Sequence, residues 1–122
     1  MAQEPLVAVT LYHNPRCSKS RCALELVRER GIEPTIIPYL EQPPERATLE
    51  ALVRLTGAAS VRELMRTKED EYKALELARV SDEQALLDAL VAHPRLLERP
   101  IAVVGDKAVV ARPPERGLEL LP

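Results

Sequence analysis

The order in which apolar patterns follow one another constrains the fold of this 122-residue chain more than any single motif. The β-branched run "LVAVTLY" at residues 6–12 predicts a buried strand, and a helical spacing of apolar residues follows at 18–30. The run "PTIIPYL" at residues 34–40 predicts a second strand, shortened by its internal proline. This β-α-β order predicts two parallel strands joined by a crossover helix.

The rest of the chain carries helical patterns first and strand patterns afterwards. Helices are expected in a block at about residues 45–95, and the next run predicts a hairpin with strands at 101–104 and 108–111 around a Gly-Asp-Lys turn. A short closing helix is expected at residues 114–121. The β-α-β unit, the helical insert and the final β-β-α unit together predict an α/β protein with a mixed sheet of the thioredoxin-like (glutaredoxin-like) type, forming one domain over residues 1–122.

Local signals indicate where individual helices begin and end. Gly31 follows the first helical pattern and supplies a left-handed stop. Ser81 and Gln84 have the spacing of a capping box and predict the start of the last helix in the block. The buried stripe of that helix is expected to comprise Leu86, Leu87, Leu90 and Val91. Because the chain contains no Phe or Trp, its core must be built from Leu, Val, Ile and Ala.

Composition and charge exclude several classes of partner. The formal net charge of −2 gives no basis for binding nucleic acid or an anionic membrane. No apolar run approaches the roughly 20 residues of a membrane span, and the N-terminus lacks the features of a secretory signal. We therefore expect a cytoplasmic protein without membrane association. The excess of 13 Arg over 4 Lys indicates either anion recognition or a GC-rich coding sequence.

The stretch "HNPRCSKSRC" at residues 13–22 holds both cysteines of the chain and follows directly after the first predicted strand. Cys17 falls where the next helix begins, close to unpaired backbone N–H groups and the positive end of the helix dipole. Arg16, Lys19 and Arg21 add positive charge nearby. We therefore expect the pKa of Cys17 to lie below the usual thiol value of about 8.5, which favours a reactive thiolate. The same N–H groups can bind the oxygens of an anion held against the sulfur.

The second cysteine, Cys22, has the wrong spacing for a simple redox pair. Residues five apart in a helix point about 140° away from each other, so a bridge between Cys17 and Cys22 would require the first turn to unwind. Cys22 is interpreted either as a partly buried, inert side chain or as a resolving thiol. The cysteines and the histidines at 13 and 93 match no zinc spacing, so no metal site is expected.

Three neighbours of Cys17 admit more than one role. Ser20 lies one turn after Cys17, so its hydroxyl faces either the sulfur or an oxyanion, or is simply solvated. His13 either promotes thiolate formation or only completes the turn. Asn14, which precedes a proline, is interpreted as a turn former.

Three distant arginines occupy unusual positions. Arg66 closes the segment "RELMR", whereas Arg99 precedes Pro100 and Arg112 precedes Pro113 at the two ends of the predicted hairpin. Composition alone would place all three on the solvated surface. In a thioredoxin-like layout, however, the loop before the third strand faces the cysteine turn, and its proline is usually cis.

The whole chain resembles the glutaredoxin-linked arsenate reductases and their close uncharacterised relatives. The segments that carry the resemblance are "YHNPRCSKSR", "EPTIIPYLEQPP", "RELMRTKEDEYKALEL", "HPRLLERPIAV" and "ARPPE". The form "PRCSKSR" is similar to that of a housekeeping branch of the family. By this resemblance Cys17 is the nucleophile, Arg66, Arg99 and Arg112 bind the oxyanion, and Pro100 is the cis proline.

The resemblance also implies the reaction and its partners. His13 and Ser20 fall on positions that tune the thiol in that family. Arsenate or a similar oxyanion would be reduced through a covalent bond between Cys17 and arsenic, with glutathione as co-substrate, glutaredoxin as protein partner and no bound cofactor. A mechanism with one protein cysteine makes Cys22 dispensable. We expect a monomer.

Two other functions compete with this hypothesis. A glutathione-dependent thiol reductase without arsenate activity would keep Cys17 but would not need all three arginines. A redox regulator that binds RNA polymerase would share the fold, but such regulators carry C-x2-C, and Ser20 stands where their second cysteine would be.

Overall fold

The computed structural model describes residues 8–121, so residues 6 and 7 of the first predicted strand lie outside the described residues. A mixed four-stranded sheet in the order β2-β1-β3-β4 forms the centre of the fold. The strands are β1 (Val9–His13), β2 (Thr35–Pro38), β3 (Ile101–Val104) and β4 (Lys107–Val110). β1 runs parallel to β2 and antiparallel to β3, and β3 and β4 form the predicted hairpin. The thioredoxin-like α/β class expected from the element order is therefore confirmed.

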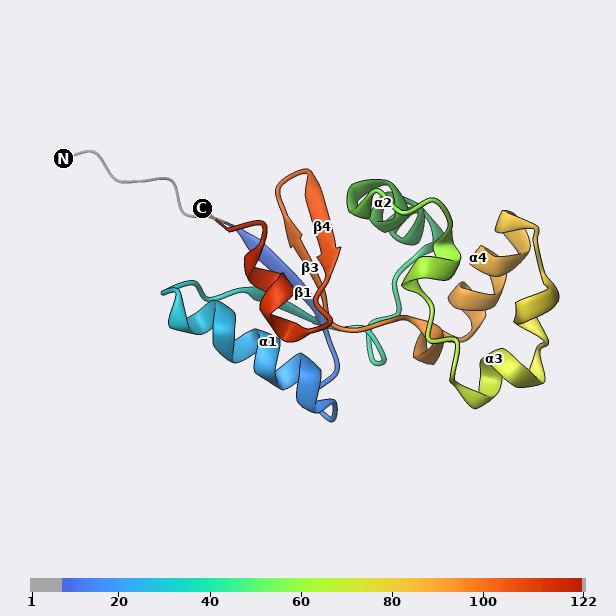
Figure 1. Ribbon diagram of the computed structural model, residues 1–122, viewed down its shortest axis with the longest axis horizontal. Coiled ribbons are helices and arrows are strands. Elements are labelled where there is room, and N and C mark those ends of the chain that lie inside the picture. Colours follow the sequence, from blue (N-terminus) through green and yellow to red (C-terminus); the bar gives the residue numbers. More distant parts are fainter. Residues whose placement is uncertain (1–7, 122) are drawn as a thin grey trace.

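Helix α1 (Ser18–Glu29) makes the crossover between β1 and β2. It ends where Gly31 adopts a φ of 78°, which only glycine reaches without strain. The closing 3-10 helix η4 (Pro114–Leu118), shorter than the predicted 114–121, lies beside α1 (Figure 1). Apolar side chains of α1 pack on Val9 and Leu11 of β1 to form one core cluster.

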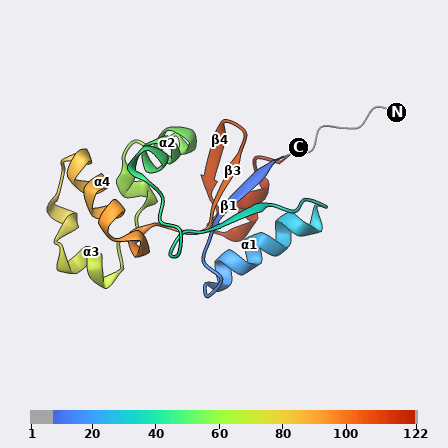
Figure 2. The same cartoon turned by 180° about the vertical axis from the view of Figure 1, so that it is seen from behind.

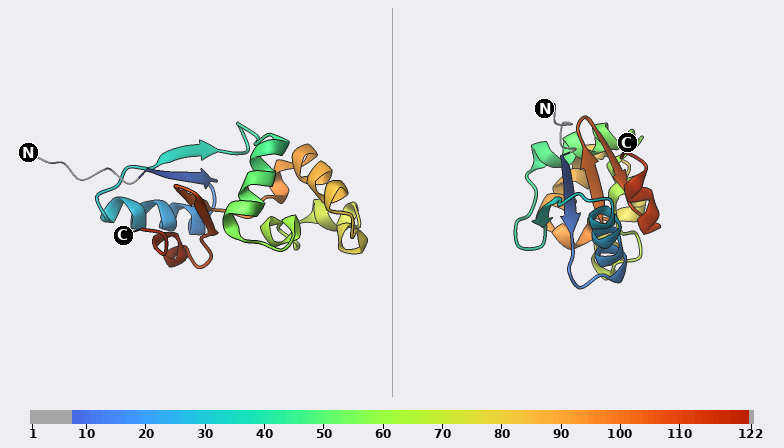
Figure 3. Two further views of the ribbon diagram at one scale, coloured as in Figure 1. Left: turned by 90° about the horizontal axis from the view of Figure 1, so that it is seen from above. Right: turned by 90° about the vertical axis from the view of Figure 1, so that its left-hand side faces the viewer.

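A helical block is inserted between β2 and β3. It packs against the face of the sheet opposite α1 and forms one end of the elongated molecule, with α1 and η4 toward the other end (Figures 1 and 2). The block comprises α2 (Arg46–Thr56), η1 (Val61–Leu64), α3 (Asp70–Ala74), η2 (Leu77–Arg79), α4 (Glu83–Ala92) and η3 (Pro94–Leu96). Helix α2 contacts both β4 and α4, which connects the block to the sheet (Figure 3).

The larger core cluster lies between the sheet and the helical block. Leu49 and Leu52 of α2 are 1% and 2% exposed, and they share this cluster with Tyr12 and Ile101 of the sheet. Full burial of each leucine contributes about 1.5–3 kcal/mol. The prediction of a core built only from Leu, Val, Ile and Ala was wrong, because Tyr39 and Tyr72 are also buried in this cluster.

Two local predictions for helix α4 were wrong. Its N-cap is Asp82 rather than Ser81, because the Asp82 side chain accepts a hydrogen bond from the Gln84 N–H at 3.2 Å. Val91 is 39% exposed, since it lies about 140° around the helix from Leu86, at the edge of the apolar stripe. Within residues 8–121, no helix is long and apolar enough to cross a membrane.

Candidate active site

Cys17 occupies the N-cap of α1, directly after the turn that follows β1. The turn is fixed by two hydrogen bonds to Asn14, whose carbonyl accepts from the Cys17 N–H and whose side-chain oxygen accepts from the Arg16 N–H, each at 3.0 Å. The Cys17 carbonyl accepts the first helical hydrogen bond, from the Arg21 N–H at 3.0 Å. The thiol therefore stands over the open N–H groups of the first helical turn, as the sequence predicts.

The pKa of the Cys17 thiol is lowered by its surroundings. Partial burial acts to raise this pKa, but the backbone N–H groups of Ser20 and Lys19 and the guanidinium groups of Arg99 and Arg112 together outweigh it. The predicted direction of the shift agrees with the structure, but the main charges differ from those expected. They come from the distant Arg99 and Arg112, whereas the guanidinium group of Arg21 donates to the Pro15 carbonyl at 2.9 Å.

Ser20 and His13 form a buried pair beneath the turn. Ser20 is 0% exposed and His13 is 6% exposed, so the solvated role considered for Ser20 is wrong. The Ser20 hydroxyl accepts a hydrogen bond from the Asn14 N–H at 3.0 Å and is bonded to His13 Nδ1 at 2.7 Å. Burial first, and then the charges of Arg28 and Arg21, lower the pKa of His13. The hydrogen bond between the Ser20 hydroxyl and His13 Nδ1 ties the end of β1 to the first turn of α1.

The three distant arginines line one cavity of about 300 Å³, together with Thr67, Lys68, Glu69 and Glu98. Two backbone hydrogen bonds of 2.7 Å, Arg66 N–H to Leu96 and Glu98 N–H to Leu64, bring the end of η1 beside the segment that precedes β3. Arg112 donates to the Arg99 carbonyl at 3.1 Å. The peptide bond between Arg99 and Pro100 is cis, and so is that between Arg112 and Pro113.

Two carboxylates lie among these arginines, and the sequence analysis missed both. Glu69 pairs with Arg66 at 3.1 Å, and Glu98 lies 3.4 Å from Arg99 and 3.7 Å from Arg112. The carboxylates hold the guanidinium groups in place, and the cations of the cavity still outnumber them. Glu98 was detectable in principle because it adjoins Arg99 in the sequence.

Tyr39 is a third residue of this region that the sequence analysis missed. It follows β2 directly, and the pairing of His13 with Pro38 places Asn14 and Tyr39 at the same end of the two parallel strands. Tyr39 is 0% exposed and lines a second cavity of about 470 Å³ that shares Arg66 with the first one. The predicted parallel pairing was a signal for its location, because the ends of parallel strands meet at one edge of a sheet.

Cys22 is exposed rather than partly buried, and both cysteines are free thiols. Its position five residues after Cys17 turns it toward solvent on the far side of α1. His93, the other histidine, pairs with Glu71 at 2.7 Å in the helical block. Among the described residues, no group of three or more His, Cys, Asp and Glu side chains could hold a metal ion.

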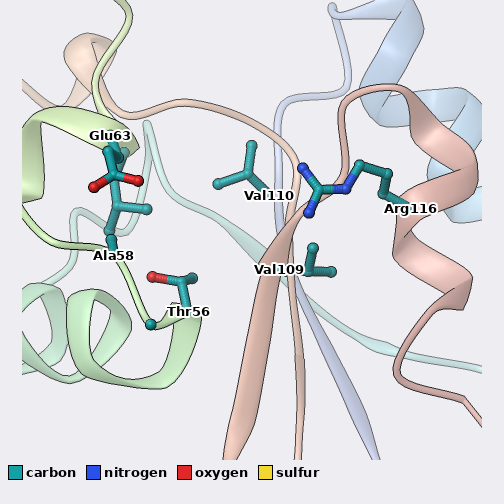
Figure 4. A pocket seen from close by; sticks show the side chains of 8 residues that line it. Thr56, Ala58, Glu63, Val109, Val110 and Arg116 are labelled. Atoms are coloured by element: carbon teal, nitrogen blue, oxygen red, sulfur yellow. The ribbon is translucent and has the colours of Figure 1, made fainter.

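A further cavity of about 180 Å³ lies between the helical block and β4 (Figure 4). Its polar side chains already have partners within the protein. The Thr56 hydroxyl donates to the Leu52 carbonyl at 2.8 Å, Glu63 accepts from the Ala59 N–H at 2.7 Å, and Arg116 pairs with Glu119 at 3.3 Å. We assign no chemistry to this cavity.

Comparison with known proteins gives consistent results over nearly the whole chain. The model of the ArsC family matches residues 12–120. The uncharacterized protein YfgD of Escherichia coli K12 is 54% identical over 114 residues, which cover 93% of this chain and 96% of that protein. An arsenate reductase of Neisseria meningitidis serogroup A is 48% identical over 108 residues, which cover 88% and 92%. The structure of an arsenate reductase from Vibrio cholerae superimposes with a TM-score of 0.93 at 44% identity, covering 96% of this chain and 100% of that chain.

Proposed function

The chain belongs to the ArsC family, and on this premise we propose that it reduces arsenate to arsenite through a covalent bond between the Cys17 sulfur and arsenic. One observation carries the proposal. The thiol with the lowered pKa is within electrostatic reach of Arg99 and Arg112, which line a single cavity together with Arg66. A nucleophilic sulfur beside clustered guanidinium groups suits a tetrahedral oxyanion substrate.

The first step joins arsenate to the protein. The Cys17 thiolate attacks arsenic, an arsenic–oxygen bond breaks, and the departing oxygen takes up protons and leaves as water. The arginines of the cavity neutralise the charge on the remaining oxygens, which lowers the barrier to attack by one anion on another. Arsenic keeps its oxidation state in this step, so no reductant is required.

Electrons enter through two further thiols. Glutathione attacks the adduct, its sulfur bonds to arsenic, and a second oxygen leaves as water. A glutaredoxin thiolate then attacks the glutathione sulfur, and the electron pair of the sulfur–arsenic bond passes to arsenic, which is thereby reduced by two electrons. Hydrolysis of the bond between Cys17 and trivalent arsenic releases arsenite and regenerates the thiol. Glutathione is a co-substrate in this scheme, and the protein itself contributes only one cysteine.

The pair formed by Ser20 and His13 supports the nucleophile indirectly. Its hydrogen bonds fix the turn at Asn14 and so position the N–H groups that stabilise the Cys17 thiolate. We therefore assign both residues a positioning role, separate from the oxyanion-binding role of the arginines.

The test is arsenate-dependent oxidation of NADPH, coupled through glutathione, glutaredoxin and glutathione reductase, with arsenite measured directly. Wild type should produce arsenite, whereas Cys17→Ser should not, and Cys22→Ser should match wild type. A folded wild-type protein that reduces glutathione mixed disulfides but no arsenate would replace the proposal with a thiol reductase.

A further inference from the structure

Tyr39 carries a buried hydroxyl without a hydrogen-bond partner. Its side chain is 0% exposed, and within the described residues no group meets the geometry of a hydrogen bond to its Oη, although the Asn14 side chain interacts with it outside that geometry. The guanidinium Nε of Arg99 is the other buried side-chain atom in this condition. Buried polar groups without partners are rare because burial removes their hydrogen bonds to water. Two such groups in one region indicate donors held for a ligand.

The hydroxyl lies in the same electrostatic environment as the Cys17 thiol. Burial raises the pKa of Tyr39, the charges of Arg99 and Arg66 and the nearby Asn14 side chain oppose this effect, and the Cys17 charge adds to it. The raised pKa keeps the hydroxyl protonated at neutral pH, so it remains a donor. Arg66 lines both the Tyr39 cavity and the cavity of the three arginines, which makes the two cavities neighbours.

Another buried tyrosine shows what a structural hydroxyl looks like in this protein. Tyr72 in α3 is 6% exposed, and its hydroxyl accepts a hydrogen bond from the Arg62 guanidinium group. Both tyrosines fill the same core cluster with their rings. Only the hydroxyl of Tyr72 has a partner, so packing alone does not explain why a hydroxyl is present at position 39.

We propose that the Tyr39 hydroxyl donates a hydrogen bond to the bound oxyanion and thereby acts as a fourth oxyanion-binding group beside Arg66, Arg99 and Arg112. The inference rests on the proposed function, because the oxyanion it names is the substrate of that reaction. Solvent does not reach the hydroxyl, so a neighbouring side chain must move when the ligand binds. Arg66 is the neighbour that this movement would involve, because it lines both cavities.

A neutral donor adds something that the arginines do not. Glu69 and Glu98 already neutralise part of the positive charge of the three arginines. A buried phenol carries no charge for a carboxylate to neutralise, and its O–H pairs with an anion oxygen more strongly than with a neutral acceptor. Tyr39 therefore strengthens binding of the oxyanion without adding charge to the cavity.

The experiment measures arsenate affinity by calorimetry in the Cys17→Ser background, where no covalent adduct forms, for Tyr39→Phe and for the matched control Tyr72→Phe. Tyr39→Phe should weaken arsenate binding by about tenfold, as expected for loss of a hydrogen bond to a charged group. Its melting temperature should fall less than that of Tyr72→Phe, because only the Tyr72 hydroxyl loses a well-formed hydrogen bond. Tyr72→Phe should melt earlier and bind arsenate like its parent. With Cys17 restored, Tyr39→Phe should raise KM for arsenate more than it lowers kcat.

Two results for Tyr39→Phe would overturn the inference. The variant could bind arsenate as its parent does, and if it also melts earlier, the hydroxyl is structural. The substitution could also raise the pKa of Cys17 and change nothing else, which would make the hydroxyl a partner of the thiolate. The pH dependence of Cys17 alkylation measures this pKa. If the parent binds no arsenate, the inference fails together with the proposed function. A parent that binds arsenate tightly while wild type does not reduce it would contradict the reaction alone.

Discussion

Arg62 in the helical block and Arg99 beside Cys17 are both partly buried arginines, but their guanidinium groups are hydrogen-bonded differently. Arg62 donates to the Tyr72 hydroxyl and to the carbonyls of Leu77, at 2.9 Å, and Val80. Arg99 has a carboxylate neighbour at 3.4 Å and a buried Nε without a partner. The block uses its buried polar groups to hold its own short helices together. The site keeps donors unpaired, which lowers stability slightly and favours binding of an anion.

The largest effect on arsenate turnover should come from replacing the proposed nucleophile, Cys17. Cys17→Ser should lower arsenate turnover by at least about a thousandfold, because the serine hydroxyl is not ionised at neutral pH. Its melting temperature should stay near that of wild type, since the Cys17 side chain makes no capping hydrogen bond. Arsenite formation and thermal unfolding, measured on the same samples, check both parts. Retained turnover would move the chemistry to another group.

Substitution of Arg99 should lower arsenate turnover and not the stability of the fold. Arg99→Gln should reduce kcat/KM for arsenate by about a hundredfold, the size expected when one donor to a developing oxyanion is removed. Arg116→Gln is the matched control, because Arg116 is exposed and pairs with Glu119 on η4. Equal losses in both variants would contradict a specific role for Arg99 and indicate a general effect of charge.

Arg62 should show the opposite pattern. Arg62→Met keeps the aliphatic stem but leaves the Tyr72 hydroxyl and two carbonyls without their donor, so the free energy of unfolding should fall by about 2 kcal/mol. Denaturant unfolding measures the loss, and arsenate turnover per folded molecule should stay close to that of wild type. A large fall in turnover of the folded variant would show that the block and the site are not separable in this way.

The smallest effect concerns the thiol itself. In a Cys22→Ser background, the alkylation rate of Cys17 should rise with pH around a midpoint below that of the urea-unfolded chain, because the folded environment lowers the thiol pKa. Arg99→Gln should move this midpoint upward, since it removes one of the charges that favour the thiolate. A midpoint unchanged by Arg99→Gln would assign the lowered pKa to the backbone N–H groups alone.

Much of the fold could be predicted because its signals are local. The β-branched runs, the helical spacing of apolar residues between them and Gly31 predict the β-α-β unit, and the position of Cys17 at the start of α1 follows from the strand and turn that precede it. The burial of Ser20 could not be predicted, because it depends on how α1 packs against the end of β1. The unpaired hydroxyl of Tyr39 was also out of reach, since the lack of a partner is a property of the packed molecule.

The convergence of the arginines was available only through resemblance. Arg66 and Arg99 are separated by most of the helical block, and no periodicity in the sequence connects them. The pairing of the chain around Met65 with that around Leu97 brings them together, and backbone pairing between distant segments leaves little trace in composition.

The pairing of Met65 with Leu97 also indicates where new sequence can be inserted into the chain. The bridge between Met65 and Leu97 closes the intervening chain into a loop whose two ends lie next to Arg66 and Arg99 in the sequence. Lengthening a closed loop is inexpensive, since each doubling of its length costs only about 0.6 kcal/mol. A peptide grafted at the exposed Leu75, next to the left-handed Glu76, would lengthen the loop far from its fixed ends. The part of the helical block around Leu75 can therefore accept new sequence without rebuilding the chemistry of the site.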